Sequence, residues 1–197
     1  MPATERKITP ADILAWEKYS TERSAFRKNI VAVKKNRRVE VGPFVTFYFE
    51  NYDTMWLQVQ EMLHIEKGGE AQLPDELAAY NPLIPQGDEL IATLMIEIDD
   101  PKRRDRELYR LAGIEESAYI ALNQERIPGI PTAYDERTTP EGKTSSVHWV
   151  SFKFIPEQIG KFKMPSVEAV LGVAHAAYSH MAVIMPDIRG ELAKDFR

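Results

Sequence analysis

Hydrophobic and polar residues alternate from Val39 to Phe49, and this period of two predicts a β-strand with one buried face. The odd-numbered positions carry the apolar side chains and should therefore face the core. The dipeptide Gly42-Pro43 interrupts the alternation and indicates a bulge or a sheet edge, because proline cannot donate to a ladder of hydrogen bonds. A helix is predicted from Thr54 to Lys67, where apolar residues recur at helical spacing.

The later apolar segments continue this pattern. Leu90 to Ile98 is apolar on both faces, as expected of a central strand. Further strands are expected at 118–125, 146–154, 167–173 and 178–185, although a helical interpretation of the last two remains open. The long polar connection before residue 146 is expected to form an extended hairpin with its tip near Pro140.

Together these patterns predict an α+β fold with a mainly antiparallel sheet of five to six strands, helices packed on it and a long late hairpin. A length of 197 residues fits a single domain. Within it we expect an N-terminal helical segment at 1–38, the sheet with its helices at 39–185 and a C-terminal helix at 186–197.

Composition removes several classes of function. The chain has no cysteine, which excludes disulfides, thiolate catalysis and Fe–S ligation by its own side chains. Its net charge of −5 opposes binding to nucleic acid or an anionic membrane. No apolar run approaches the roughly 18 to 20 residues of a membrane-spanning helix, and no secretory signal is seen, so we expect a cytoplasmic protein.

Two arginines, Arg37 and Arg38, end a basic cluster that begins at Lys34. Cations at a helix C-terminus interact favourably with the helix dipole, so helix termination is one interpretation of the cluster. A binding site for an acidic partner or a phosphate is the other.

The helix after the first strand carries the pair Glu61 and His64 opposite its apolar stripe, where they should meet solvent or a partner. This Glu-x-x-His spacing occurs in di-iron helix bundles, but those need two such motifs and the chain has one, so we expect no metal there. Glu66 falls within the apolar stripe near the helix end. It needs either a salt bridge to Arg37 or Arg38 or a functional role in a pocket.

Two further residues are candidates for buried polar groups. Glu97 lies on the predicted central strand, and His148 alternates with apolar residues on another strand. A histidine in such a row is usually a core residue with satisfied hydrogen bonds, and otherwise an acid, base or ligand. His175 and His180 are five residues apart, which does not fit the zinc motif HExxH.

Five separated blocks carry a family resemblance: VEVGPFVTFYFEN, QEMLHIE, NPLIP, LIATLMIEI and GKTSSVHWVSFKF. In this order they resemble a bacterial family of uncharacterised proteins, domain of unknown function 3501. The resemblance implies no activity and no catalytic residues. Its members are often encoded beside a rubrerythrin and a heterodisulfide-reductase-like Fe–S protein, which implies a redox or peroxide-response setting. Members tend to have arginine where this chain has His64, and this weakens a metal role for that histidine.

We expect no cofactor, and three hypotheses for the function follow. The first is an accessory protein that docks on a redox metalloprotein, a rubrerythrin-like or Fe–S protein, through Arg37, Arg38, Glu61 and His64. The second is a small enzyme or ligand-binding protein whose pocket contains Glu66, Glu97, His148 and an arginine. The third and weakest is a metalloprotein that uses His148, His175 and carboxylates.

Overall fold

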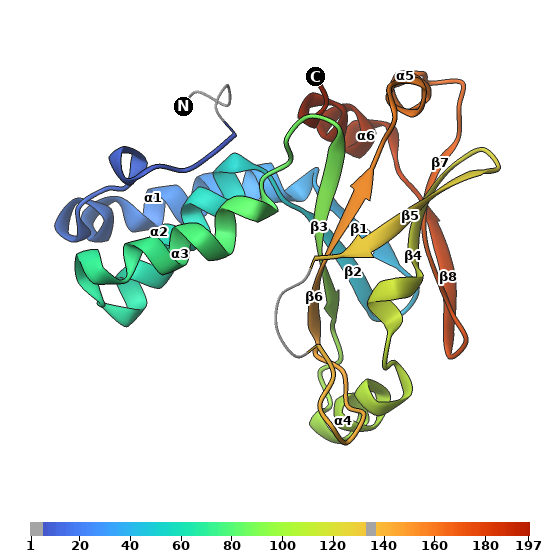
Figure 1. Cartoon of the computed structure of the whole chain (residues 1–197), viewed down its shortest axis with the longest axis horizontal. Coiled ribbons are helices and arrows are strands. Elements are labelled where there is room, and N and C mark those ends of the chain that lie inside the picture. The colour runs from blue at the N-terminus through green and yellow to red at the C-terminus, as the bar shows by residue number, and fades with distance from the viewer. Residues whose placement is uncertain (1–5, 133–136) are drawn as a thin grey trace.

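The computed structural model describes residues 6–132 and 137–197, and within them eight strands form one antiparallel sheet (Figure 1). The strands are β1 (Arg38–Val41), β2 (Val45–Phe49), β3 (Glu89–Ile96), β4 (Ala118–Leu122), β5 (Glu125–Pro131), β6 (Val147–Lys153), β7 (Ala169–His175) and β8 (Tyr178–Val183). Their order across the sheet is β1-β2-β3-β6-β5-β4-β7-β8. The fold is α+β, but the prediction of a five-to-six-stranded sheet is wrong.

The extra strands come from two turns that the periodicity conceals. Gly42-Pro43 forms the turn between β1 and β2 and not a bulge within one strand. The predicted strand at 118–125 contains a second turn, where Asn123 adopts a left-handed backbone conformation with φ of +54°. Asparagine tolerates that conformation, so β4 and β5 reverse direction there. The expected late hairpin is present, because β5 pairs with β6 and Thr138 bridges to Thr144.

The first and last strands approach each other and nearly close the sheet into a barrel. Tyr178 of β8 links them, because its hydroxyl donates a hydrogen bond to the carbonyl oxygen of Val41 at 2.6 Å. The Tyr178 hydroxyl oxygen also accepts hydrogen bonds from the backbone N–H groups of Phe44 at 3.3 Å and Val45 at 3.2 Å. Gly42 has a φ of +74°, and a Cβ atom there would lie 2.5 Å from this hydroxyl oxygen. The turn therefore requires glycine.

Six α-helices accompany the sheet in the described residues: α1 (Trp16–Lys35), α2 (Tyr52–Glu66), α3 (Leu73–Tyr80), α4 (Pro101–Arg110), α5 (Pro156–Lys163) and α6 (Pro186–Leu192). Short 3-10 segments include η1 (Pro10–Asp12), η2 (Gly69–Ala71), η4 (Ile114–Ser117) and η5 (Ala193–Asp195). Helices α1, α2 and α3 pack side by side and form a layer beside the barrel (Figure 1). Among the described residues, none of the helices is long and apolar enough to cross a membrane.

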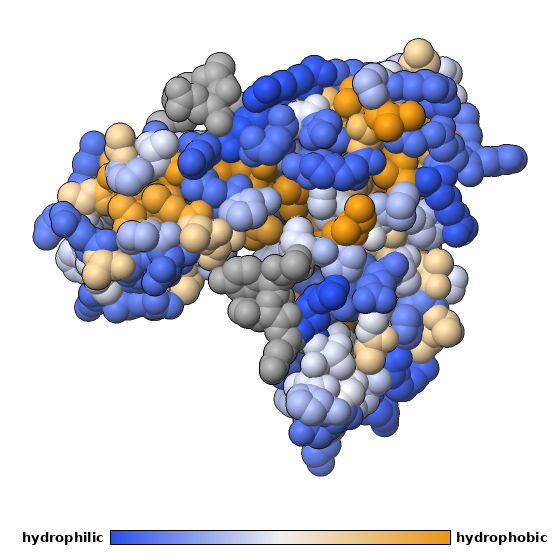
Figure 2. All heavy atoms as spheres, in the orientation of Figure 1, coloured by the Kyte–Doolittle hydropathy of each residue, from blue (hydrophilic) through white to orange (hydrophobic). Residues whose placement is uncertain are grey.

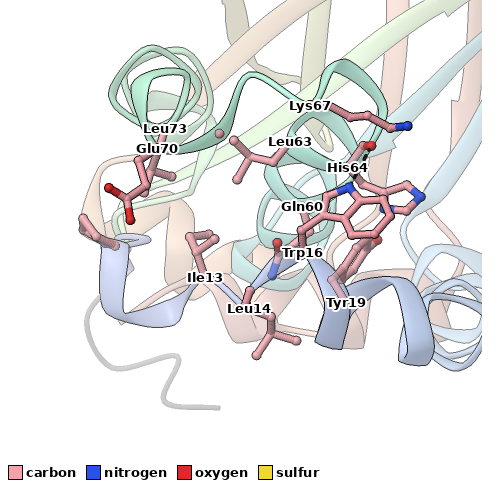
Figure 3. Close-up of a pocket in the computed structure, with 13 residues that line it drawn as sticks. Ile13, Leu14, Trp16, Tyr19, Gln60, Leu63, His64, Lys67, Glu70 and Leu73 are labelled. Atoms are coloured by element: carbon pink, nitrogen blue, oxygen red, sulfur yellow. Dashed lines mark hydrogen bonds between the residues drawn. The ribbon is translucent and has the colours of Figure 1, made fainter.

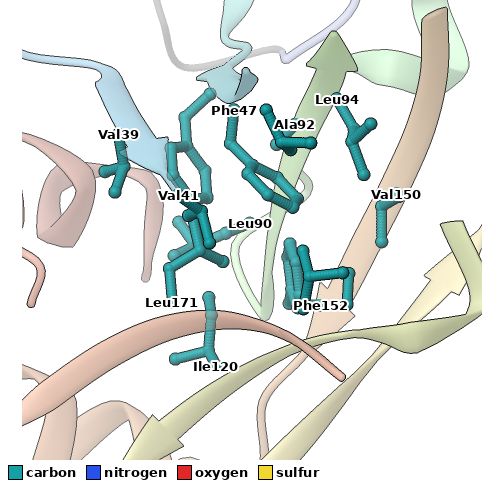
Figure 4. Close-up of a cluster of buried hydrophobic side chains, with 14 of the residues drawn as sticks. Val39, Val41, Phe47, Leu90, Ala92, Leu94, Ile120, Val150, Phe152 and Leu171 are labelled. Atoms are coloured by element: carbon teal, nitrogen blue, oxygen red, sulfur yellow. The ribbon is translucent and has the colours of Figure 1, made fainter. Parts of the chain in front are cut away.

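Two hydrophobic clusters hold the sheet and the helices together. The larger one fills the barrel with side chains from the inner faces of the strands (Figure 4). It includes the odd-numbered residues of the first two strands, as the alternation predicts. The second cluster lies between the three helices of the layer and the outer face of the sheet, where Ile91 and Trp149 contribute. Figure 2 shows hydrophobic surface gathered over this helical layer.

Candidate functional site

A cavity of about 740 Å³ lies between the chain leading into α1 and the C-terminal half of α2 (Figure 3). We call it the helical cavity. Its lining residues are Pro10, Ile13, Leu14, Ala15, Trp16, Tyr19, Gln60, Leu63, His64, Lys67, Gly69, Glu70 and Leu73. Most of these side chains are apolar, so the cavity favours an apolar occupant.

Local hydrogen bonds hold the N-terminal wall in place. Thr9 and Asp12 form a capping box around η1, in which the Asp12 carboxylate accepts from the Thr9 N–H at 2.8 Å. The Asp12 carbonyl oxygen also accepts from the indole N–H of Trp56 on α2 at 2.8 Å. Further back, the Asn81 amide exchanges two hydrogen bonds with the backbone of Ile8. The wall is therefore tied to both α2 and the end of α3.

Gln60 is a buried polar residue in the wall of the helical cavity. Its side chain is 2% exposed, and its Nε2 has no hydrogen-bond partner among the described residues. In Figure 3 this amide lies among Leu14, Trp16 and Leu63. A buried donor without a partner costs about 1–3 kcal/mol, so proteins seldom retain one in an apolar wall without a reason.

The mouth of the helical cavity is aromatic. Trp16 stacks on His64 with ring centroids 5.3 Å apart, and its indole N–H donates to the His64 carbonyl oxygen at 3.3 Å. The Lys67 ammonium lies 5.8 Å from the Trp16 ring centroid. Trp16 is 45% exposed, so its indole ring and the Lys67 ammonium lie next to each other at the opening of the cavity.

Glu61 and His64, which the helical stripe places opposite the apolar face, are partly exposed. They lie against α1, which covers that face of α2. Arg23 binds the Glu61 carboxylate through two hydrogen bonds, and the Tyr19 hydroxyl donates a third at 2.6 Å. The hydrogen bonds to Glu61 lower its pKa to about 2, and those from Arg23 contribute most. The negative charge of Glu61 therefore links α2 to α1.

The two arginines of the basic cluster lie in different environments, one buried and one exposed. Arg37 is 1% exposed, and its guanidinium donates to the carbonyl oxygens of Phe49 at 2.9 Å and Glu50 at 3.0 Å and to the Asp195 carboxylate. Arg38 is exposed and pairs with Glu40 at 2.5 Å. Arg37 therefore anchors the C-terminus to the start of the sheet and is not accessible to a partner.

Glu66 and Glu97 are both exposed, although the sequence predicts buried acids. Glu66 accepts a hydrogen bond from the Gln72 amide at 2.8 Å, so the expected salt bridge to Arg37 or Arg38 is replaced by a local contact. Glu97 follows the end of β3 and accepts from the Tyr48 hydroxyl at 2.9 Å. These acids do not meet His148, which lies inside the barrel opposite Leu94.

His148 is a core residue, and its nearest charged neighbours are Glu115 and Arg137. Its Nε2 contacts the Ser145 carbonyl oxygen at 2.8 Å, while its Nδ1 lies 3.7 Å from the Glu115 carboxylate. Arg137 lies 3.6 Å from the same carboxylate. Burial lowers the pKa of His148 more than Glu115 raises it, so the imidazole is neutral. No group of three or more His, Asp or Glu residues in the described ranges could hold a metal ion, and His175 contacts a backbone carbonyl oxygen instead.

Sequence reasoning missed Gln60, Trp16 and Glu115. Gln60 could have been found, because it interrupts the apolar stripe between Trp56 and Leu63 of the predicted helix. Glu115 lies in a 3-10 turn just before β4, and no periodic pattern marks such a turn.

Comparisons with known proteins agree with the expected family and assign no activity. The family described as Protein of unknown function (DUF3501) matches residues 7–196. The chain is similar to a novel protein of unknown function from Burkholderia pseudomallei K96243, known from a crystal structure. The two are 34% identical with a TM-score of 0.89, and the match covers 97% of this chain and 100% of that one. No curated protein matches the chain.

Proposed function

Because the chain belongs to the domain of unknown function 3501 family, whose description gives no activity, we propose from the structure that it is a ligand-binding protein. Its ligand is a small, largely apolar molecule that carries a hydrogen-bond acceptor such as a carbonyl oxygen. The site is the helical cavity.

The observation that supports this proposal most directly is that Nε2 of Gln60 has no hydrogen-bond partner among the described residues. A carbonyl oxygen placed against Nε2 would satisfy the donor, and the surrounding apolar walls would strengthen that bond by excluding water. The cavity volume of about 740 Å³ is within the usual range of roughly 300–1,000 Å³ for small-molecule sites. A small number of polar groups in a largely apolar pocket is also the usual way to fix the orientation of a ligand.

The test compares two probes of nearly the same shape. Acetophenone is a planar ketone, and ethylbenzene has a similar body without the oxygen. We expect the wild-type protein to bind acetophenone at least about tenfold more tightly, which is the effect of one buried hydrogen bond. Binding is followed through the indole N–H resonance of Trp16, which lines the cavity.

The variant Gln60→Leu should lose this preference, because leucine fills similar space and cannot donate. Gln58→Leu is the matched control, since Gln58 lies on the same helix and does not line the helical cavity. Equal binding of the two probes by the wild-type protein would refute the proposal. A preference for the ketone that survives in Gln60→Leu would also refute it.

We propose docking on an acidic redox metalloprotein, either rubrerythrin-like or Fe–S, as a second candidate function. The supporting observation is that Lys34, Lys35 and Arg38 are exposed around the end of α1, although Arg37 is not. Such a patch favours an acidic partner. The double variant Lys34→Glu and Lys35→Glu should then lose a co-purifying iron protein that the wild-type chain retains under mild conditions. Retention of that protein by the variant, or stoichiometric metal on the isolated chain, would count against docking.

A further inference from the structure

Buried carboxylates in this protein are almost all neutralised by a cation. Five acidic residues are buried in the described part of the chain. Four of them have a basic partner: Glu89 with Lys153 at 2.6 Å, Glu107 with Arg110 at 2.7 Å, Glu115 with Arg137 at 3.6 Å, and Asp195 with Arg37. The exception is Glu50, which is 5% exposed and whose carboxylate oxygens have no lysine, arginine or histidine nitrogen within 4.0 Å in the described residues.

Glu50 is nevertheless held firmly. Its carboxylate accepts a hydrogen bond from the Thr93 hydroxyl at 2.6 Å, and its backbone N–H donates to the Ile91 carbonyl oxygen at 2.8 Å. An ionised carboxylate that is removed from water needs a cation or several donors to offset its desolvation. Four of the five buried acids in the described ranges meet that need within the chain, so Glu50 calls for a cation from elsewhere.

Glu50 lines a second cavity, of about 400 Å³, between the helical layer and the outer face of the sheet. We call it the interlayer cavity. Its lining residues are Lys34, Tyr48, Glu50, Thr54, Met55, Gln58, Tyr80, Thr93, Met95, Val147 and Trp149. It shares no lining residue with the helical cavity, so the two sites are separate.

Three aromatic rings, those of Tyr48, Tyr80 and Trp149, line the interlayer cavity together with the carboxylate. Aromatic faces attract organic cations, and methionine and valine side chains supply apolar contact for a carbon skeleton. A metal ion fits less well, because no group of three or more His, Asp or Glu side chains occurs in the described ranges. Lys34 also lines the cavity, from the last turn of α1, and its nitrogen is more than 4.0 Å from Glu50.

We propose that the interlayer cavity binds an organic ammonium ion, whose charged nitrogen pairs with Glu50 and whose apolar part lies against Tyr80 and Trp149. This site is independent of the helical cavity and of its ligand.

The test uses 2-phenylethylammonium chloride and its neutral analogue 2-phenylethanol as probes. The chain has three tryptophans, so each indole N–H can be followed in one spectrum of the labelled protein. We expect the ammonium probe to shift the Trp149 resonance and to leave Trp16 unchanged, which separates this site from the helical cavity. The alcohol should bind at least about tenfold more weakly, because it cannot form the charge-assisted bond.

The variant Glu50→Gln keeps the size of the side chain and an oxygen that can accept from Thr93, so it should fold. Its affinity for the ammonium probe should fall at least about tenfold. Glu40→Gln is the matched control, because it removes one negative charge from the neighbouring strand β1 outside the cavity. Unchanged affinity in Glu50→Gln would overturn the proposal. If that variant does not fold, equal binding of the ammonium ion and the alcohol by the wild-type protein would overturn it.

Discussion

Arg23 of α1 and Glu61 of α2 form a two-pronged ion pair. The Nε atom of the arginine lies 2.8 Å from one carboxylate oxygen, and its Nη2 atom lies 2.7 Å from the other. The pair joins the two helices whose ends enclose the helical cavity, and Tyr19, which lines that cavity, donates to the same carboxylate. The cavity wall is therefore positioned by charge as well as by packing.

This pair makes the stability of the protein depend on pH. The pKa of Glu61 is about 2 in the folded protein and 4.5 ordinarily, so the unfolded chain takes up the proton first as the pH falls. The stabilisation is complete above about pH 5 and is lost between the two pKa values. We expect Glu61→Gln to lower the free energy of unfolding by about 1 kcal/mol at pH 6 and by less at pH 3. Urea unfolding at both pH values measures this.

The control for that prediction is Glu66→Gln on the same helix, where the carboxylate is exposed and hydrogen-bonded to Gln72. It should change the free energy of unfolding by less than about 0.5 kcal/mol at either pH. A difference between Glu61→Gln and wild type that does not narrow on acidification would show that the ion pair carries no such stability.

The same substitution at the adjacent arginines Arg37 and Arg38 should lower the stability by very different amounts. Arg37→Met leaves the Asp195 carboxylate and two backbone carbonyl oxygens without their donor, so we expect a loss of about 3 kcal/mol or more in unfolding free energy. Arg38→Met should cost less than about 1 kcal/mol, because its ion pair with Glu40 is exposed. Thermal or urea unfolding of both variants measures the contrast, and equal losses would contradict it.

Tyr178 should control how tightly the barrel seam is closed. Tyr178→Phe removes one donor and one acceptor from three backbone groups of the β1–β2 turn, which should cost about 1–3 kcal/mol. Hydrogen exchange should accelerate at the amides of Phe44 and Val45. Tyr109→Phe is the control, because Tyr109 is 48% exposed. Unchanged exchange at both amides would mean that the hydroxyl does not hold the seam.

His148 should contribute a second pH dependence, of the same sign. Burial lowers its pKa below the ordinary 6.5, so the unfolded chain binds a proton more readily as the pH falls through that value. Between pH 8 and pH 5.5 the wild-type protein should lose unfolding free energy that His148→Gln does not lose. Guanidinium unfolding across this range tests it, and parallel losses in the two proteins would exclude the histidine as the source.

The sequence predicts local structure well where one face of an element is buried. The alternation from Val39 to Phe49 identifies the correct inward side chains, since burial of one strand face imposes a period of two. Periodicity does not reveal the turn at Gly42 or the one at Asn123, because the two turns take only three and two residues and leave the apolar pattern nearly intact. The strand count was underestimated for that reason.

The candidate site could be predicted less well, because it depends on which elements meet. The face of α2 that carries Glu61 and His64 is polar and is nevertheless covered by α1, which brings Arg23 and Trp16 to it. Glu97 lies in a largely apolar run and is nevertheless exposed just past the end of β3. Neither outcome follows from periodicity, since periodicity reports one element at a time.

Urea unfolding of the wild-type protein and of Gln60→Leu, each with and without acetophenone, tests the central claim most directly. If the Gln60 amide is kept for a ligand, Gln60→Leu should be more stable than wild type by about 1 kcal/mol without acetophenone, because it removes a buried donor that has no partner in the described part of the chain. Acetophenone should then stabilise the wild-type protein and not the variant. A variant that is less stable than wild type and gains equally from acetophenone would contradict the account.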